Sequence, residues 1–256
     1  MMIKAIFFDM DGTLFSHKAG KIPSSATNAL WKLKENGIKI VVTTGRHFVE
    51  LEELSVLDFP FDAYITVNGQ ICLDEKKEAF FLNPILGKDK EKLVKIFQEK
   101  QIPVIINARN GIYMNCVNED VRKTQEDVCS AIPPILEYDN EEIFMASIFR
   151  REENESDIHI FENLNITRWN KRAVDVVPIG SGKTRGIEAF LEKYDISKEE
   201  TMAFGDGEND IGMIKFANIG VAMGNAKPKV QSVADYVADD IDNDGVAKAL
   251  KYFGLF

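Results

Sequence analysis

Short apolar runs alternate with amphipathic stretches at both ends of the chain. The continuous runs are typical of buried strands, and apolar positions recurring every three or four residues predict helices. Strands that alternate with helices pair in parallel through right-handed crossovers. The expected strands are 5–8, 38–43, 63–67, 201–204, 219–223 and 236–237; the expected helices lie between Pro23 and Gly37, around 48–54, over 183–194, through Ile214, after Pro228 and from Gly245.

The middle of the chain breaks this alternation. After a hairpin signal at Asn68-Gly69, the stretch from Pro84 mixes further hairpins with helices. We therefore predict an α/β fold with a doubly wound, Rossmann-like parallel-sheet core (1–83 and 179–256) and an inserted α+β domain (84–178). Within the insertion we expect helices near 89–101, 119–131 and 156–164, and strands at 104–106, 112–114, 143–149, 166–169 and 173–177.

Two carboxylates, Asp9 and Asp11, directly follow the first strand. Side chains at positions i and i+2 of an extended segment share a face, so both could point into one small volume. Paired carboxylates repel each other unless a cation joins them or one stays protonated, and Mg²⁺ is the simplest such cation. The same residues with Gly12 could instead form a turn that caps a helix. On these residues alone, both interpretations remain open.

Composition narrows the class of protein. With 256 residues, 45% of them hydrophobic and 28% charged, the chain is typical of globular proteins. No apolar run reaches the roughly 18 residues of a membrane span, and no signal peptide is visible. A net charge of −10 argues against nucleic-acid binding. Cys72, Cys116 and Cys129 form no CxxC pair, so we expect reduced packing residues in a cytoplasmic protein.

Polar groups follow several of the predicted parallel strands. Asp9 and Asp11 follow the first strand, Thr44 the second, and the Asp206–Asp210 segment a later one, while Lys183 opens the helix after the insertion. The carboxyl ends of parallel strands lie at one edge of the sheet, where ligands bind in open α/β folds. We therefore expect these groups to converge at one site, although they are far apart in sequence.

These segments resemble the four motifs of the haloacid dehalogenase superfamily. The matching residues are Asp9-x-Asp11-Gly12-Thr13-Leu14, Thr44-Gly45-Arg46, Lys183 and Gly205-Asp206-Gly207-Glu208-Asn209-Asp210. The long insertion before Lys183, which ends in Val174-Asp175-Val176-Val177-Pro178, is similar to that of the Cof-type sugar-phosphate phosphatases. The resemblance covers nearly the whole chain and is strongest in the core.

The resemblance implies a role for each motif. Asp9 would be the nucleophile that forms an aspartyl-phosphate, and Asp11 the general acid and base. Asp9, the backbone carbonyl of Asp11, Asp206 and Asp210 would hold Mg²⁺. The residues that would bind the phosphate group are Thr44, Gly45, Lys183 and Asn209.

The implied function is Mg²⁺-dependent hydrolysis of small phosphorylated metabolites, with sugar phosphates as the expected class. A phosphomutase of the phosphomannomutase type and a non-catalytic phosphometabolite-binding protein are the alternatives. The insertion would act as a cap that selects the substrate. We expect a monomer or homodimer without nucleic-acid or membrane partners.

Several residues fit these patterns less simply. Gly182 and Thr184 flank Lys183 where the family has serine and glycine, and Val177 replaces the first glycine that a P-loop requires.

The segment 240–245 imitates a calcium loop, but its twelfth position is Lys251, so a loop capping the last helix is expected. Arg46, Asn68 and Glu208 have both structural and binding interpretations, and the cap turn residues Arg109, Asn110 and Asn115 are expected to be ordinary turn residues.

Overall fold

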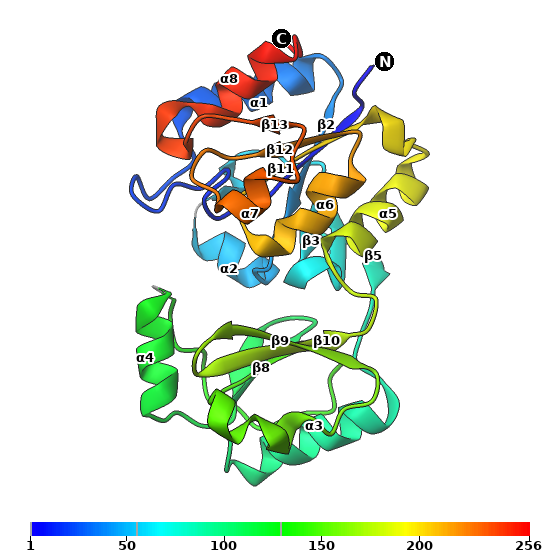
Figure 1. Cartoon of the computed structure of the whole chain (residues 1–256). Helices are drawn as coiled ribbons and strands as arrows, with labels where there is room; N and C mark the ends of the chain where they lie inside the picture. The colour runs from blue at the N-terminus through cyan, green and yellow to red at the C-terminus, as the bar shows by residue number, and fades with distance from the viewer. Residues whose placement is uncertain (1, 55, 129) are drawn as a thin grey trace. The chain divides into compact units, whose positions relative to one another are not determined.

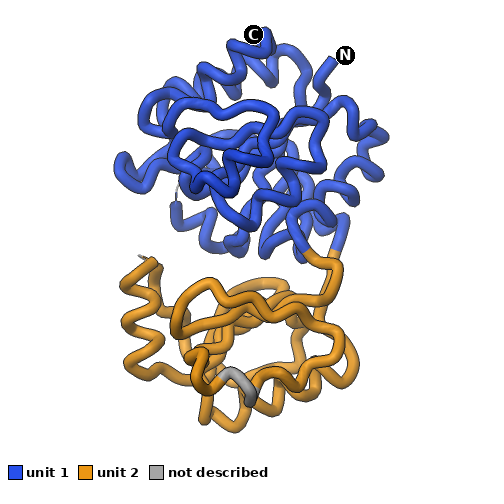
Figure 2. The backbone as a smooth tube through the Cα atoms, in the orientation of Figure 1, with its two compact units in different colours: residues 1–81, 182–256 blue, residues 82–181 orange. Residues whose placement is uncertain are grey.

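The chain forms two compact units in a computed structural model that describes residues 2–54, 56–128 and 130–256. The first unit consists of residues 1–81 and 182–256, and the second of residues 82–181 (Figure 2). The insertion expected from the sequence, 84–178, lies within the bounds of the second unit. No helix in the described part of the chain is long and apolar enough to cross a membrane.

The first unit is built on one eight-stranded sheet with the order β13-β12-β11-β1-β2-β3-β4-β5 (Figure 1). Neighbouring strands from β13 through β3 pair in parallel, and β4 is antiparallel to β3. The strands are β1 (Ala5–Phe8), β2 (Lys39–Thr43), β3 (Ala63–Thr66), β4 (Ile71–Asp74), β5 (Ala79–Leu82), β11 (Thr201–Gly205), β12 (Ile219–Ala222) and β13 (Tyr236–Val237). The strand order reverses direction at β1, which makes the carboxyl end of β1 the topological switch point where ligands bind in such sheets.

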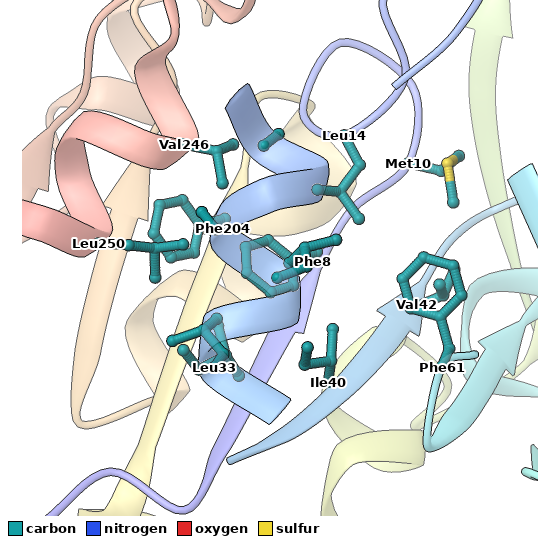
Figure 3. Packing of buried hydrophobic residues seen from close by; sticks show 14 of the residues in the cluster. Phe8, Met10, Leu14, Leu33, Ile40, Val42, Phe61, Phe204, Val246 and Leu250 are labelled. Carbon is teal, nitrogen blue, oxygen red and sulfur yellow. The ribbon is translucent and has the colours of Figure 1, made fainter. Parts of the chain in front are cut away.

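Two layers of helices cover the sheet because its strands alternate apolar side chains between both faces. Phe8 packs on one face with Leu33 of α1 and Leu250 of α8 (Figure 3). Phe7 packs on the other face with Phe190 of α5, at 5.4 Å between ring centroids. The helices of this unit are α1 (Ser24–Glu35), α2 (Phe48–Glu53), α5 (Lys183–Tyr194), α6 (Ile211–Phe216), α7 (Pro228–Gln231) and α8 (Gly245–Tyr252).

Proline and glycine mark the two ends of α1. The helix stops before Gly37, which has φ of +74°, so the glycine stop is confirmed. At the other end, Pro23 is the N-cap residue and no side chain caps the helix. Proline is tolerated at this position because the N–H that it lacks would have no partner within the helix.

The second unit has a five-stranded sheet with the order β7-β6-β8-β10-β9, in which neighbouring strands are antiparallel (Figure 1). One face of this sheet packs against Leu93 and Phe97 of α3. The elements are α3 (Gly87–Glu99), β6 (Val104–Ala108), β7 (Ile112–Met114), α4 (Glu119–Asp127), β8 (Ile143–Ile148), β9 (Leu164–Asn170) and β10 (Ala173–Pro178).

The helix expected near 156–164 is wrong. A 3₁₀ segment, Glu152–Ile158, overlaps the start of this range, no α-helix follows it, and β9 begins at Leu164. Leu164 and Ile166 pack into the core of the unit, whereas Asn165 and Thr167 are exposed. This two-residue period belongs to a strand, and pairing with β10 decides the outcome.

Of the predicted reduced cysteines, Cys72 and Cys116 are free thiols, and Cys72 is buried. Burial in apolar surroundings raises the pKa of Cys72, which keeps the thiol protonated and unreactive. Cys129 lies outside the described residues.

Helix α5 approaches the sheet closely at Gly186. A Cβ atom there would lie 2.4 Å from Cγ2 of Ile65, 3.0 Å from Sγ of Cys72 and 3.2 Å from Cα of Gly69. We expect Gly186→Ala to lower the free energy of unfolding by about 1–3 kcal/mol, because overpacking forces neighbouring groups apart. Urea unfolding, followed by Trp31 fluorescence in a Trp169→Phe background, measures this for the first unit. Glu188→Ala in the same helix is the exposed control, and equal stability of both variants would contradict the tight contact.

Candidate active site

The loop after β1 brings Asp9 and Gly12 against β11. Asp9 is buried, and its N–H donates to the carbonyl of Phe204 at 2.9 Å. Gly12 has φ of +80°, and a Cβ atom on it would lie 2.4 Å from Oδ2 of Asp206. Only glycine fits there, because any side chain would collide with that carboxylate while holding a strained backbone. The turn thereby brings Asp206 close to the end of β1.

Three carboxylates gather at this switch point. One oxygen each of Asp9, Asp206 and Asp210 lies within 4.8 Å of the others. The Lys183 side chain, 1% exposed, donates hydrogen bonds to Asp9 and, at 2.5 Å, to Oδ1 of Asp210. The convergence expected for these four residues is therefore present, and Lys183 is the first residue of α5.

The two acids after β11 differ in the partners they already have. Oδ2 of Asp210 accepts the N–H groups of Asp206 and Gly207 at 3.0 and 2.8 Å, and Oδ1 accepts Lys183. Asp206 instead accepts the hydroxyl of Thr13 at 2.8 Å and keeps its other oxygen near Asn225, at 3.4 Å. Asp206 thus has the greater capacity to bind a metal directly, while Asp210 shapes the loop and anchors the lysine.

Burial sets the electrostatics of the cluster. It raises the pKa of Asp9 well above its usual range, and repulsion by Asp210 adds to the effect while Lys183 opposes it. Burial likewise raises the pKa of Asp206 to about 6, opposed by the hydrogen bond from Thr13. Burial disfavours the charged form of Lys183, but Asp210 and Asp9 outweigh it and raise its pKa. Three acids and one lysine leave an excess of negative charge that a hard cation would neutralise.

The donor set fits the metal implied by the sequence. Asp9 and Asp206 offer carboxylate oxygens, the ligands that Mg²⁺ prefers, and the backbone carbonyl of Asp11 follows in the same loop. The chemistry of these donors therefore suits a hard divalent cation held by Asp9 and Asp206, with Asp210 behind them.

The Asp11 side chain does not join the cluster. Arg46 binds it through two of its three guanidinium nitrogens, Nε to Oδ2 at 2.6 Å and Nη2 to Oδ1 at 2.7 Å, and Nε2 of His17 lies 3.0 Å from Oδ1. The expectation that both carboxylates share one volume rested on an extended segment, but β1 ends at Phe8 and Asp11 lies in the following turn. The bond to Asp11 raises the pKa of Arg46, so the guanidinium stays charged.

The predicted phosphate-binding residues lie on three neighbouring loops. Thr44, 1% exposed, follows β2, and its hydroxyl accepts the N–H of Arg46 at 3.1 Å. A Cβ atom on Gly45 would lie 3.3 Å from Oδ1 of Asn68, and Asn209 donates to that same oxygen at 3.1 Å. Asn68, at φ of 53°, therefore both forms the turn after β3 and joins the loops of the site.

Sequence reasoning missed Asn225. Its amide nitrogen donates to the carbonyl of Gly12 at 2.8 Å, and its oxygen accepts the N–H of Ile241 at 3.1 Å. Asn225 therefore links the loop after β12 to the loop after β1 by a hydrogen bond. No spacing in the sequence marks this residue, although it follows a predicted strand of the same sheet.

Glu208 and the calcium-like segment 240–245 both make structural contacts. Glu208 forms ion pairs with Lys229 at 2.6 Å and Lys227 at 3.5 Å, which favours the exposed structural interpretation. In the calcium-like segment, Asp240 caps a 3₁₀ turn by accepting the N–H of Asp242, and Asp242 accepts the hydroxyl of Ser16 at 2.6 Å. The predicted cap on α8 is wrong, because the N-cap residue Asp244 makes no capping bond; its carboxylate binds Ser25 instead.

Comparison with known proteins agrees with this geometry. Residues 6–250 match the family model for haloacid dehalogenase-like hydrolases. The structure of BT1666 from Bacteroides thetaiotaomicron, studied among phosphatases of the haloalkanoate superfamily, is 36% identical with a TM-score of 0.88, covering 100% of this chain and 96% of that one. The subclass IIB sugar phosphatase BT4131 is also 36% identical, with a TM-score of 0.83 and 99% and 100% coverage. YkrA of Bacillus subtilis is 33% identical over 261 residues, 98% of each chain.

Proposed function

The chain belongs to the haloacid dehalogenase-like hydrolase family and is a phosphatase of its Cof-type branch, and we propose that it hydrolyses sugar phosphates through an aspartyl-phosphate on Asp9 with the help of Mg²⁺. The observation that carries the proposal is the buried cluster of Asp9, Asp206 and Asp210 around Lys183 at the topological switch point. The resemblance of the chain to a sugar phosphatase supports the substrate class.

In the proposed reaction an oxygen of Asp9 attacks phosphorus, and the bond to the sugar oxygen breaks. Asp11 gives its proton to that oxygen as the alcohol leaves. Water then attacks phosphorus, Asp11 takes the proton from water, and inorganic phosphate leaves with Asp9 restored. Arg46 and His17 hold the Asp11 carboxylate outside the acidic cluster, so one of its oxygens must leave these partners before Asp11 can give or take a proton.

The phosphate dianion must approach three acids, and the chain supplies compensating groups. Lys183 reaches Asp9 directly, so it can bind a phosphoryl oxygen beside the nucleophile. Thr44, Gly45 and Asn209 would complete the phosphate site from their adjoining loops. Bound Mg²⁺ would neutralise the charge that develops on the phosphoryl oxygens. The second unit would act as the cap that selects the substrate.

Phosphate release tests the reaction. Wild-type protein should release inorganic phosphate from an aryl phosphate and from hexose phosphates in Mg²⁺, and EDTA should abolish the release. Transfer of phosphate between sugar positions with little net release would instead indicate a phosphomutase. A cytoplasmic location and a monomeric or homodimeric state remain predictions.

Metal binding should also be visible without turnover. We expect Mg²⁺ to raise the melting temperature of wild-type protein, because a ligand that binds only the folded state stabilises it. Asp206→Asn should abolish that shift, while Asp242→Asn, which alters an acid of the calcium-like segment, should keep it. The shift should shrink as the pH falls below about 6, since protonation of Asp206 competes with the metal. An unchanged shift in Asp206→Asn would contradict the site.

A further inference from the structure

The turn 67–70 between β3 and β4 has a backbone that joining two strands does not require. Val67, Asn68 and Gly69 all have positive φ, at 52°, 53° and 89°. A loop of this length is most often built around a type I turn, whose central residues have negative φ. Asparagine and glycine tolerate the left-handed region, but a β-branched residue such as Val67 rarely adopts it. The strain at Val67 therefore calls for another explanation.

Hydrogen bonds hold the turn in this conformation. The N–H of Val67 donates to the carbonyl of Arg46 at 2.9 Å, and the N–H of Asn68 donates to the carbonyl of Thr44 at 3.0 Å. Val67 is also fully buried. Strained residues persist only where the surrounding structure fixes them, and they are concentrated at functional sites. Both bonds end on the loop after β2, so the turn is held against the loop that carries Thr44.

The turn also contacts the other two segments of the proposed phosphate site. A Cβ atom on Gly69 would lie 2.3 Å from the carbonyl oxygen of Gly182 and 3.3 Å from Cα of Lys183. On the other side, Oδ1 of Asn68 accepts a hydrogen bond from Nδ2 of Asn209 at 3.1 Å. All of these residues belong to the first unit. The turn thus touches each of the three segments that carry the proposed phosphate ligands.

The side-chain amide of Asn68 has one group left over. Its Oδ1 is occupied by Asn209, so Nδ2 is the group that can donate. In the part of the chain that the structure describes, this nitrogen has no acceptor. The side chain is partly exposed, so a ligand from solvent can reach it.

A second unused donor lies close to the first. The N–H of Gly45 also has no acceptor among residues 2–54, 56–128 and 130–256. A Cβ atom on Gly45 would lie 3.3 Å from Oδ1 and 3.4 Å from Nδ2 of Asn68, so the two donors are neighbours. Donors fixed in advance by the fold stabilise an anion without having to reorganise. A phosphoryl group has several acceptor oxygens and can use both donors at once.

We infer that Asn68 is a further ligand of the phosphoryl group, and that its Nδ2 donates a hydrogen bond to a phosphoryl oxygen beside the N–H of Gly45. The left-handed turn presents this donor, and Asn209 fixes its orientation by occupying Oδ1. This role rests on the proposed phosphatase function and deepens it, because it adds a ligand from outside the four sequence motifs. Asn68 then has both of the roles that the sequence left open, in the turn and at the phosphate.

Inorganic phosphate is the probe, because it is the product of the proposed reaction and binds without turnover. Asn68→Gly keeps the left-handed backbone and removes the donor, whereas Asn68→Asp keeps the acceptor for Asn209 and replaces the donor by a negative charge. In calorimetric titrations with saturating Mg²⁺, both variants should bind phosphate about tenfold or more weakly than wild type, as expected when a hydrogen bond to a charged group is lost. In both, kcat/KM should fall by similar factors for an aryl phosphate and a hexose phosphate, because the two esters share the phosphoryl group.

Asn140→Gly and Asn140→Asp are the matched controls. Asn140 is an exposed asparagine of the second unit with φ of 56°, so the substitutions have the same effect on a left-handed backbone. Both controls should bind phosphate within about twofold of wild type. The rise in melting temperature caused by Mg²⁺ should persist in Asn68→Gly, because Asn68 is not a metal ligand. Loss of that rise would assign the weaker phosphate binding to a disturbed metal site and overturn the inference.

The outcomes separate this inference from the proposed function. If wild type hydrolyses phosphate esters while either Asn68 variant binds phosphate within about twofold of wild type, the donor role is overturned and the proposed function stands. Weakening in Asn68→Asp alone would reveal only a charge near the site. No hydrolysis of any phosphate ester by wild type would overturn the proposed function itself.

A measurement on wild type covers variants that fail to fold. In isotope-labelled protein observed by nuclear magnetic resonance, the side-chain amide protons of Asn68 should move downfield when phosphate binds, because donation to an anion deshields them. The amide protons of Asn140 should stay where they are. Unchanged Asn68 signals at saturating phosphate would overturn the inference.

Discussion

Replacing Asp9 by asparagine should lower kcat for phosphate release by roughly four to six orders of magnitude, as expected when a covalent nucleophile is removed. Asparagine keeps the size and shape of the side chain but lacks the charge needed to attack phosphorus. The carboxylate that is lost lies against Lys183 and within 4.8 Å of Asp206 and Asp210, so no neighbouring group has the same position at the end of β1.

Intact-mass measurements distinguish loss of the nucleophile from loss of the general base. Asp11→Asn should still accept a phosphoryl group from an activated aryl phosphate but hydrolyse the intermediate slowly, so the protein gains the mass of one phosphoryl group. Asp9→Asn should gain none. A phosphorylated Asp9→Asn protein would show that another residue is the nucleophile.

Asp9→Asn should not destabilise the fold. The pKa of Asp9 is raised in the folded protein, so the folded state binds this proton more tightly than the unfolded chain does. Stability is therefore lost as the pH rises from the usual range of an aspartate through this raised pKa, and at neutral pH the ionised group opposes folding. Asp9→Asn removes that repulsion, and in EDTA its melting temperature should equal or exceed that of wild type.

The sequence was most informative where topology converts spacing into position. Strands that end in Asp9, Thr44 and Asp206 share one edge of a parallel sheet, so their polar residues had to lie near one another once the alternation was recognised. Lys183 opens α5 as expected despite the unusual glycine before it. These are local signals, strand ends and helix starts, whose consequence in space is fixed by the fold class.

Side-chain direction within loops was not predictable in the same way. Asp11 lies beyond β1, and its partner Arg46 comes from another loop, so no alternation rule determines where it points. Asn225 acts through the Gly12 carbonyl, a backbone contact that leaves no pattern in the sequence. Asp175 was visible in an apolar strand and in the segment that carries the family resemblance, but its hydrogen bond with Ser147 depends on the register that places the two residues opposite each other.

Replacing Lys183 by methionine should have the largest effect on stability. The lysine is fully buried and donates to both Asp9 and Asp210, so its removal leaves the acids of the cluster without their counter-charge. Breaking a buried pair from one side costs about 3–5 kcal/mol. Urea unfolding followed by Trp31 fluorescence measures the loss, and Lys193→Met, a partly exposed lysine of the same helix, should change stability far less.

The cause of that loss can be isolated because the acids can be neutralised in three ways. Lowering the pH toward the raised pKa values of Asp9 and Asp206 should return part of the stability, since protonated acids no longer repel one another. Adding Asp210→Asn to Lys183→Met should return part of it at neutral pH, and saturating Mg²⁺ should do the same. Catalysis should return under none of these conditions, because neutral groups cannot bind the phosphate dianion beside Asp9 as the ammonium does. A Lys183→Met protein that is as stable as wild type at neutral pH, or whose stability ignores all three treatments, would show that the lysine does not compensate the cluster.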